Sequence, residues 1–217
     1  MSSQKEDSSI LNKIIWLLRF TIILTILYGL LKGEWETFFI SLLALALSAL
    51  PLVIEKKYRI ELPIEFELII VGFIYFAVFL GEVGDAYDTF FWWDAVLHVN
   101  SGIVLAFAGF LPLYIMYRRG KFQASPFLIA SLAFATAMAS GAVWEIFEFG
   151  MDQIFGLNMQ KSGLQDTMFD LIVDALGGLF VSVLVYKYLK NGERSIVTEF
   201  VRKFEADNPR LFWKKGR

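Results

Sequence analysis

The chain has 217 residues, of which 57% are hydrophobic, and its mean hydropathy is +0.57. A soluble domain of this length is closer to half apolar, so the composition indicates a membrane protein. The sequence contains no cysteine, which excludes disulfides and thiolate metal sites. The net charge of −2 indicates little by itself, and we expect no nucleic-acid partner.

Six apolar runs are long enough to cross about 30 Å of hydrocarbon as helices. They cover approximately residues 14–31, 35–54, 64–80, 95–117, 124–149 and 167–189. The first run is long for the core of a signal peptide and no small-residue cleavage site follows it, so we expect a retained helix. The polar head at 1–13 is predicted to be disordered and cytoplasmic.

The distribution of basic residues predicts the orientation. Eighteen of the 20 Lys and Arg residues lie in the head and the start of the first span, in the second and fourth connections, or at the end of the last span and in the tail, and only Lys32 and Lys161 lie on the opposite side. Cytoplasmic segments are enriched in Lys and Arg, so both termini are predicted to be cytoplasmic in a multi-pass protein of the cell (inner) membrane.

The first three spans, within 14–81, have few ionisable residues in their middles and are interpreted as a packing half. Glu65 and Glu67 open the third span, where we expect them to be solvated near the cytoplasmic surface. The second half, 82–190, contains small residues on all three of its spans, such as Gly102, Gly141 and Gly177, which let helices approach closely in lipid. Helices four to six are therefore predicted to pack tightly.

The tail at 191–217 has apolar residues on one helical face and basic residues between and after them. This pattern predicts a C-terminal amphipathic surface helix on the anionic inner leaflet, with a partner-binding tail as the alternative. The predicted fold class is therefore all-α: a polytopic membrane protein with six transmembrane helices and this additional helix.

Acidic residues and the single histidine recur at helical spacing along the last three spans. The three stripes are Asp94 and His98, then Glu145, Glu148 and Asp152, then Asp166, Asp170 and Asp174. Residues three or four apart share a helix face, and the predicted topology places all three stripes at the outer side of the membrane. The sequence therefore predicts one pocket of converging carboxylates.

A bound cation is the leading way to neutralise such a pocket, because an ionised side chain near a bilayer costs roughly 2.5–3.5 kcal/mol. Oxygen ligands with one imidazole suit Mg²⁺, Mn²⁺, Zn²⁺ or Fe²⁺. The predicted metal ligands are Asp94, His98, Glu145, Glu148, Asp170 and Asp174, with Asp152 and Asp166 peripheral. A di-iron bundle would need two Glu-x-x-His pairs, so a single histidine excludes it.

Other interpretations stay open at this point. Ser101 or Ser140 could act as a nucleophile with His98 as base. Asp94 and Asp166 could cap their helices, Asp152 could be solvated, and the buried carboxylates could serve as structural polar groups.

The same stretches resemble the YjdF-type family of predicted bacterial and archaeal inner-membrane proteins. The resemblance covers residues 92–178 and rests on Trp93-Asp94 with His98 and Gly102, Trp144-Glu145 with Glu148, and Gln165-Asp166-Thr167 with Asp170 and Gly177. It supports the choice of residues but implies no reaction, since the family has no settled activity. VanZ-like membrane proteins, linked to glycopeptide tolerance, are similar more distantly, with Ala95 where their pattern usually has Lys.

The functional hypothesis is a membrane-embedded, metal-dependent hydrolase or transferase. It would act on a lipid or envelope precursor from the extracytoplasmic side, with Glu148 as general base and His98 in the catalytic site. A cation or proton transporter or sensor that uses the same carboxylates is the alternative, and a purely structural membrane protein is the third.

Overall fold

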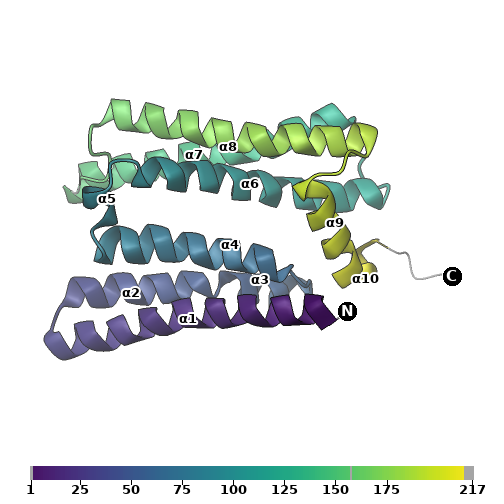
Figure 1. Ribbon diagram of the computed structural model, residues 1–217. Coiled ribbons are helices and arrows are strands. Elements are labelled where there is room, and N and C mark those ends of the chain that lie inside the picture. Colours follow the sequence, from purple (N-terminus) through teal and green to yellow (C-terminus); the bar gives the residue numbers. More distant parts are fainter. Residues whose placement is uncertain (1, 157, 213–217) are drawn as a thin grey trace. The chain divides into compact units, whose positions relative to one another are not determined.

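The computed structural model describes residues 2–156 and 158–212, and side chains from residue 8 onward within these ranges. Every regular element in the described residues is a helix (Figure 1). Six helical segments are long and apolar enough to cross a membrane: Ser8–Lys32, Trp35–Tyr58, Ile64–Val83, Trp93–Arg118, Pro126–Phe155 and Leu164–Asn191. The predicted all-α architecture with six spans and a further C-terminal helix is confirmed.

The chain divides into two compact units, Met1–Trp93 and Asp94–Arg217. The first unit contains α1 (Ser2–Lys32), α2 (Trp35–Ser48), α3 (Leu50–Tyr58), α4 (Ile64–Ile74), the π-helix η1 (Tyr75–Val83) and α5 (Ala86–Thr89). Because α1 begins at Ser2, the segment predicted as a disordered head is helical from that residue onward. No proline or glycine interrupts residues 2–13, so the helix of the first span continues toward the N-terminus.

The second span consists of two helices, because α2 ends and α3 begins at Ala49. Pro51 lies in the first turn of α3 and has no backbone N–H to donate to the preceding turn. Helix α3 ends at Arg59, which adopts the left-handed conformation with φ 54°.

The first unit buries an apolar cluster and one ion pair. Ile22, Ala44, Ile74 and Phe79 form the cluster. The Arg19 guanidinium lies 3.2 Å from Glu67 Oε1 and donates to the backbone oxygen of Ser48 at 2.7 Å.

The side chain of Glu67 is only 14% exposed, so the expectation that it is solvated is wrong. Arg19, about three helical turns from the start of the Ser8–Lys32 span, supplies the charge partner of Glu67 inside the unit.

The second unit contains α6 (Trp93–Arg118), α7 (Pro126–Phe155), α8 (Leu164–Asn191), α9 (Ile196–Asp207) and α10 (Pro209–Phe212). Ser125 caps the start of α7 by accepting a hydrogen bond from the backbone N–H of Leu128, and Gly156 ends the helix with φ 68°. Helices α6 and α8 begin at the end of the bundle where α7 finishes (Figure 1).

Glycines let these three helices approach closely, as the small residues predict. A Cβ on Gly102 of α6 would lie 2.5 Å from the backbone oxygen of Asp174 on α8. A Cβ on Gly178 of α8 would lie 2.9 Å from Cβ of Ala137 on α7, and one on Gly177 would meet the backbone oxygen of Val99. Larger side chains at these positions would force the helices apart.

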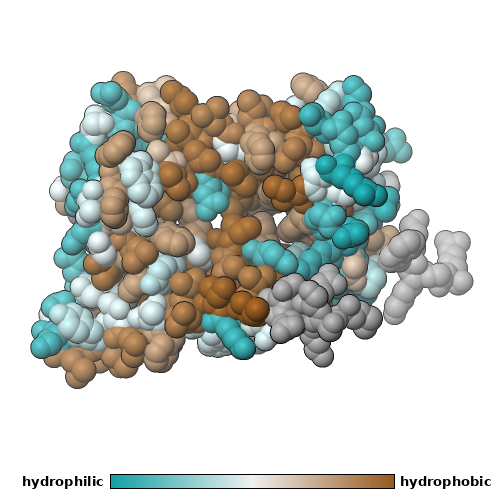
Figure 2. Space-filling view, viewed as in Figure 1, coloured by the Kyte–Doolittle hydropathy of each residue, from teal (hydrophilic) through white to brown (hydrophobic). Residues whose placement is uncertain are grey.

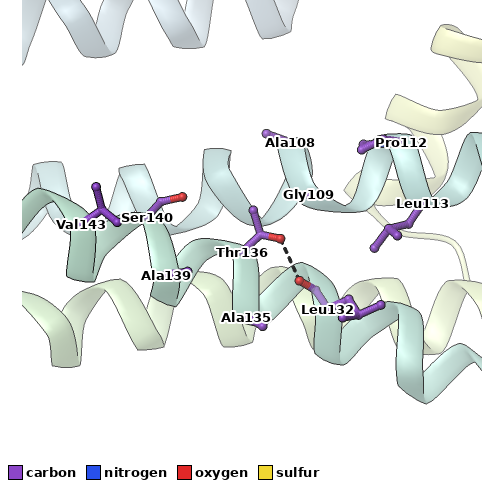
Figure 3. Close-up of a pocket in the computed structure, with 10 residues that line it drawn as sticks. All are labelled: Ala108, Gly109, Pro112, Leu113, Leu132, Ala135, Thr136, Ala139, Ser140 and Val143. Carbon is purple, nitrogen blue, oxygen red and sulfur yellow. Dashed lines mark hydrogen bonds between the residues drawn. The ribbon is translucent and has the colours of Figure 1, made fainter.

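A largely open groove of about 810 Å³ lies between the middle parts of α6 and α7 (Figure 3). Its lining is mostly small and apolar, and includes Gly109, Pro112, Leu132, Thr136 and Val143. The Thr136 hydroxyl donates to the backbone oxygen of Leu132 at 2.9 Å, so this lining residue is satisfied within its own helix.

The predicted amphipathic helix of the tail is α9, and its apolar face is buried within the second unit. Val197, Val201 and Phe204 are at most 1% exposed, and the Phe200 ring packs on Phe107 of α6 with centroids 5.2 Å apart. Glu205 accepts hydrogen bonds from the Tyr114 hydroxyl at 2.9 Å and from Arg118 at 3.1 Å. Protein therefore covers the face that would otherwise enter a leaflet, and contact of α9 with the membrane surface stays a prediction.

Apolar side chains gather over the middle of the helices, and hydrophilic ones lie nearer the helix ends (Figure 2). Trp16, Leu17, Phe147, Ile172 and Leu176 are examples of large hydrophobic side chains about half exposed or more. A surface of this kind is suited to hydrocarbon and not to water.

Candidate metal centre

The acidic residues predicted from the sequence come together at one end of the second unit. Asp94 and His98 lie in the first turns of α6, Asp170 and Asp174 in the first turns of α8, and Glu145 and Glu148 in the last third of α7. All three helices thus place these side chains near the same end of the bundle, the end at which α6 and α8 begin.

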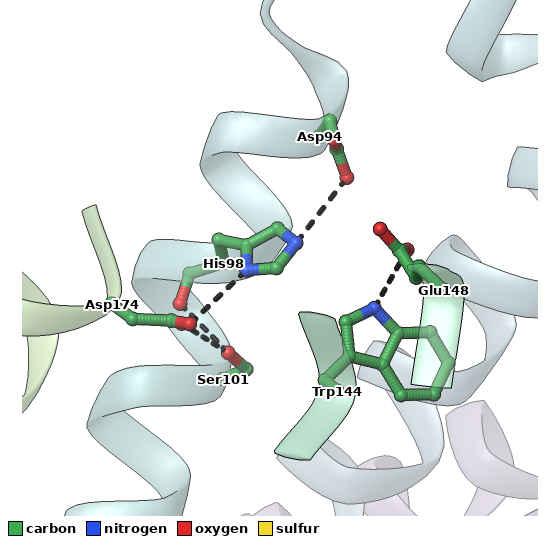
Figure 4. A network of polar contacts seen from close by, with 6 residues as sticks. All are labelled: Asp94, His98, Ser101, Trp144, Glu148 and Asp174. Carbon is green, nitrogen blue, oxygen red and sulfur yellow. Dashed lines mark hydrogen bonds and ion pairs between the residues drawn. The ribbon is translucent and has the colours of Figure 1, made fainter. Parts of the chain in front are cut away.

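His98 lies between two carboxylates (Figure 4). Its Nδ1 is 3.2 Å from Asp174 Oδ2, and its Nε2 is 3.7 Å from Asp94 Oδ1. The histidine is 7% exposed and Asp174 is 1% exposed. A carboxylate behind one ring nitrogen fixes the orientation of the imidazole and directs the other nitrogen outward as an electron-pair donor.

Ser101 supports Asp174 from the opposite side. Its hydroxyl lies 2.8 Å from Asp174 Oδ1 and 2.8 Å from the backbone oxygen of His98, the residue one turn earlier. The hydroxyl is therefore directed at acceptors other than the imidazole, which does not support Ser101 as a nucleophile activated by His98. Asp174 is better explained as the group that holds His98 than as a metal ligand itself.

Three residues offer ligand atoms close enough to share one ion. One ligand atom each from Asp94, His98 and Asp170 lies within 4.8 Å of the other two. Asp170 is 2% exposed and its Oδ2 has no hydrogen-bond partner. A buried carboxylate oxygen without a donor is rare in folded proteins and suits a cation ligand.

Glu145 is the second buried carboxylate without hydrogen bonds. It is 4% exposed, its buried oxygens have no hydrogen bond of good geometry, and the Thr167 hydroxyl lies close enough to interact with its carboxylate. It lies within electrostatic range of Asp94, His98 and Asp166, so it belongs to the same cluster as the three possible ligands.

Glu148 lies one turn beyond Glu145 and is partly exposed. The indole Nε1–H of Trp144 donates to Glu148 Oε1 at 2.8 Å (Figure 4). Glu148 is within electrostatic range of Asp94, Glu145 and His98. A carboxylate held by one donor at the rim of such a cluster is placed to accept a proton.

The two peripheral residues differ in their surroundings. Asp166 is partly exposed and lies within electrostatic range of Asp94 and His98. Asp152 instead accepts hydrogen bonds from the backbone N–H groups of Met159 and Gln160, at 2.7 and 2.9 Å. Its carboxylate stabilises the connection between α7 and α8, which neither the solvated nor the peripheral-ligand interpretation anticipated.

Three residues at the cluster were not assigned a part in it from the sequence. Lys161, in the connection between α7 and α8, lies within electrostatic range of Asp94 and Asp166, and Trp144 donates to Glu148. A Cβ on Gly141 would meet the Asp174 carboxylate. Lys161 had a sequence signal, since it is one of two basic residues on the predicted outer side, whereas the contact at Gly141 depends on helix packing.

Comparison with known proteins places the chain in a family. Residues 14–191 match the family described as "Predicted membrane protein (DUF2238)", and the chain belongs to that family. An uncharacterized protein of Thermotoga maritima is 30% identical over 137 residues, which are 63% of this chain and 70% of the relative. No solved structure matches the chain.

The family match confirms the resemblance to predicted membrane proteins without a settled activity. The more distant similarity to VanZ-like proteins stays a prediction.

Proposed function

We propose that this protein binds a divalent cation inside its membrane-embedded bundle and uses it in metal-assisted hydrolysis or phosphoryl transfer on a lipid or envelope precursor. The observation that supports the cation most directly is the approach of ligand atoms from Asp94, His98 and Asp170 to within 4.8 Å of one another. Two of these residues are buried, and Asp170 Oδ2 has no other partner.

The donor set favours a hard or borderline divalent cation. Two carboxylates and one imidazole suit Mg²⁺, Mn²⁺, Zn²⁺ or Fe²⁺, and the chain has no thiolate that would select a softer metal. Asp174 accepts a hydrogen bond from His98 Nδ1–H in this arrangement, so Nε2 is the nitrogen left for the ion.

The remaining groups fit an acid–base reaction at the rim of the cluster. A bound divalent cation supplies electrostatic stabilisation and lowers the pKa of a water molecule. Glu148, oriented by Trp144, would accept the proton of the attacking water and return it to the leaving group. Asp94 has a side chain that is 34% exposed, so substrate can approach the cluster from that side.

Two features argue against the alternatives. A transport pathway would continue through polar groups along α6 and α7, but the open groove between their middle parts is lined mainly by apolar residues. A purely structural network would satisfy its buried polar atoms, whereas Asp170 Oδ2 has no hydrogen bond and the Glu145 oxygens have the Thr167 hydroxyl nearby but no hydrogen bond of good geometry.

Metal analysis of the detergent-purified chain tests cation binding. After loading with Mn²⁺ or Zn²⁺ and removal of excess ion, we expect bound metal in the wild type and its loss in His98→Ala and Asp170→Asn. Asp152→Asn is the matched control, because this carboxylate bonds to loop amides at the same end of the bundle. A metal-free wild type, or unchanged metal in both variants, would refute the site.

Turnover tests the reaction separately from binding. Release of inorganic phosphate from phosphatidic acid or an isoprenyl phosphate in mixed micelles should require the metal. Glu148→Gln should retain the metal and lose at least 100-fold in rate, as expected for a general base. If the protein binds metal but turns over neither substrate in a metal-dependent way, the proposed enzymatic function is refuted and only cation binding stands.

A further inference from the structure

The end of the second unit that lies away from the candidate metal centre is basic. Helices α6 and α8 finish there, α7 begins there, and α9 and α10 follow from the end of α8 (Figure 1). Within the described residues this basic end has four carboxylates, on Glu193, Glu199, Glu205 and Asp207. Its nine basic side chains are Arg118, Arg119, Lys121, Lys187, Lys190, Arg194, Arg202, Lys203 and Arg210. The excess of positive charge suits an anionic partner.

Most of the carboxylates at the basic end are already paired within the chain. The ion pairs are Glu193–Lys187 at 3.9 Å, Glu199–Arg202 at 2.6 Å and Glu205–Arg118 at 3.1 Å. In the part of the chain that the structure describes, Arg119, Lys121 and Arg210 take part in no ion pair. These three side chains are exposed, so their charges are available to a ligand.

The packing of α10 brings two of these three residues together. The Phe212 ring of α10 lies 6.0 Å from the Tyr114 ring of α6 and 6.1 Å from the Phe204 ring of α9, between ring centroids. Arg119 Nη2 then donates to the backbone oxygen of Arg210 at 3.3 Å. A guanidinium has five N–H donors in a planar fork that matches phosphate oxygens, so most of the donors of Arg119 remain for a ligand.

Arg119 lies where a predicted span leaves the hydrocarbon. Helix α6 has 26 residues and is therefore about 39 Å long, more than the roughly 30 Å thickness of the hydrocarbon core. Arg119 follows Arg118, the last residue of this helix, and so lies at the depth of the lipid headgroups. Phosphate groups of lipids are thus the anions nearest to it.

The packing of α9 determines how the basic end can contact lipid. Val197, Val201 and Phe204 are at most 1% exposed, and Glu205 ties the helix to the Tyr114 hydroxyl at 2.9 Å. An inserted amphipathic helix would bury this apolar face among acyl chains. Since protein already covers the face, lipid can contact the basic end through its exposed cations and not through insertion of α9.

We infer that Arg119 and Arg210, with Lys121 two residues further along the chain, bind the phosphate of an anionic phospholipid at the membrane surface while α9 stays packed on the bundle. Two uncompensated guanidinium groups favour a headgroup with net negative charge over a zwitterionic one, whose own ammonium compensates its phosphate. The site lies at the end of the unit opposite the candidate metal centre, so either assignment can fail without the other.

Lipid binding to the full chain in a neutral detergent tests the site. Native mass spectrometry should show that the wild type retains phosphatidylglycerol in preference to phosphatidylcholine. The double variant Arg119→Gln/Arg210→Gln should weaken phosphatidylglycerol binding about 25-fold, or about 5-fold for each charge removed, and leave phosphatidylcholine unchanged. Arg202→Gln is the matched control, because it removes one exposed charge that Glu199 already compensates, and should change the affinity less than 2-fold.

Three results would overturn the site. Equal binding of the two lipids to the wild type would do so independently of how any variant folds. A loss in Arg202→Gln as large as that in Arg119→Gln would assign binding to the net charge of the face and not to the arginine pair. Displacement of phosphatidylglycerol by an equal concentration of inorganic phosphate would assign a soluble anion in place of a lipid.

Thiol protection tests whether α9 stays packed. The chain has no cysteine, so a thiol introduced by Val201→Cys is the only one present. In vesicles of phosphatidylglycerol and of phosphatidylcholine alike, we expect it to react with N-ethylmaleimide at least 10-fold more slowly than the thiol of Ala206→Cys, an exposed position on the same helix. Equal reactivity in phosphatidylglycerol alone would show that α9 leaves the bundle for the membrane, which contradicts the inferred mode of contact.

Discussion

The two units of this protein differ in whether their buried carboxylates have a charge partner within the chain. In the first unit Glu67 lies 3.2 Å from Arg19, which also donates to the backbone of Ser48. In the second unit Glu145 and Asp170 are more deeply buried, and three of their oxygens have no hydrogen-bond partner. The first arrangement is complete within the chain, whereas the proposed cation would complete the second.

Under the proposed function, this difference separates a structural charge from a functional one. A buried charge that has its partner contributes to a defined fold, and removing the partner is costly. Clustered carboxylates without partners destabilise the fold unless a cation compensates them. Burial of an acidic residue is therefore a poor indicator of function by itself. Whether the buried carboxylate has a charged or hydrogen-bonding partner within the chain is more informative.

The largest expected effect comes from breaking the completed pair. Arg19→Met should lower the free energy of unfolding by about 3–5 kcal/mol, because it leaves Glu67 buried and unpaired. Arg19→Met combined with Glu67→Leu should recover much of this loss. Denaturant or thermal unfolding in detergent measures both. Equal stability of Arg19→Met and wild type would show that the pair is not structural.

Glu145 should respond in the opposite direction. Without divalent cations, Glu145→Met should raise the free energy of unfolding by about 1–4 kcal/mol, since it replaces an unpaired buried carboxylate by an apolar side chain of similar length. With Mn²⁺ present the advantage should shrink or reverse, because the wild type gains binding energy. Thermal unfolding in chelator and in Mn²⁺ measures the difference; destabilisation in chelator contradicts the comparison.

A substitution at Gly141 tests whether Asp174 must be held in place beside His98, without changing any polar group. A Cβ at this position would displace the Asp174 carboxylate, so Gly141→Ala should weaken metal binding about 10–100-fold, the range seen when the group behind a metal-binding histidine is altered. Gly150→Ala on the same helix is the control, because a Cβ there meets no atom within 4 Å. Isothermal titration with Mn²⁺ distinguishes the two variants. Equal affinities would separate Asp174 from the metal centre.

Lys161 should have the smallest effect. Removing its charge in Lys161→Met should tighten divalent-cation binding up to about 5-fold, because a positive charge near Asp94 and Asp166 opposes the cation and solvent screens exposed charges. The gain should diminish in high salt. Weaker binding in this variant would assign Lys161 a supporting part in place of an opposing one.

The acidic stripes were predictable because helical spacing and topology are both visible in a sequence. Asp94 with His98 and Asp170 with Asp174 are four residues apart, and six apolar runs place their helix ends at one side. The spacing could not say which oxygen meets which nitrogen. Asp174 was expected to bind metal, and its contacts with His98 and Ser101 place it behind the imidazole.

Long-range contacts account for what the sequence did not predict. Glu67 and Arg19 are 48 residues apart, and Asp152 bonds to a connection whose path depends on how α7 ends. The apolar stripe of α9 is visible in the sequence, but a stripe of this kind fits a leaflet or another helix equally well. Only packing on α6 showed that protein covers it.

The sequence by itself determined the six spans, the helical class and, Asp152 apart, the acidic residues that cluster, because hydrophobic length and helical period are local properties of the chain. The tertiary structure alone decided which carboxylates have partners: Arg19 reaches Glu67, Ser101 and His98 reach Asp174, and Glu145 is buried without a hydrogen bond. Pairing depends on distances between helices, and these are set by how closely glycines such as Gly102 and Gly177 allow the backbones to approach.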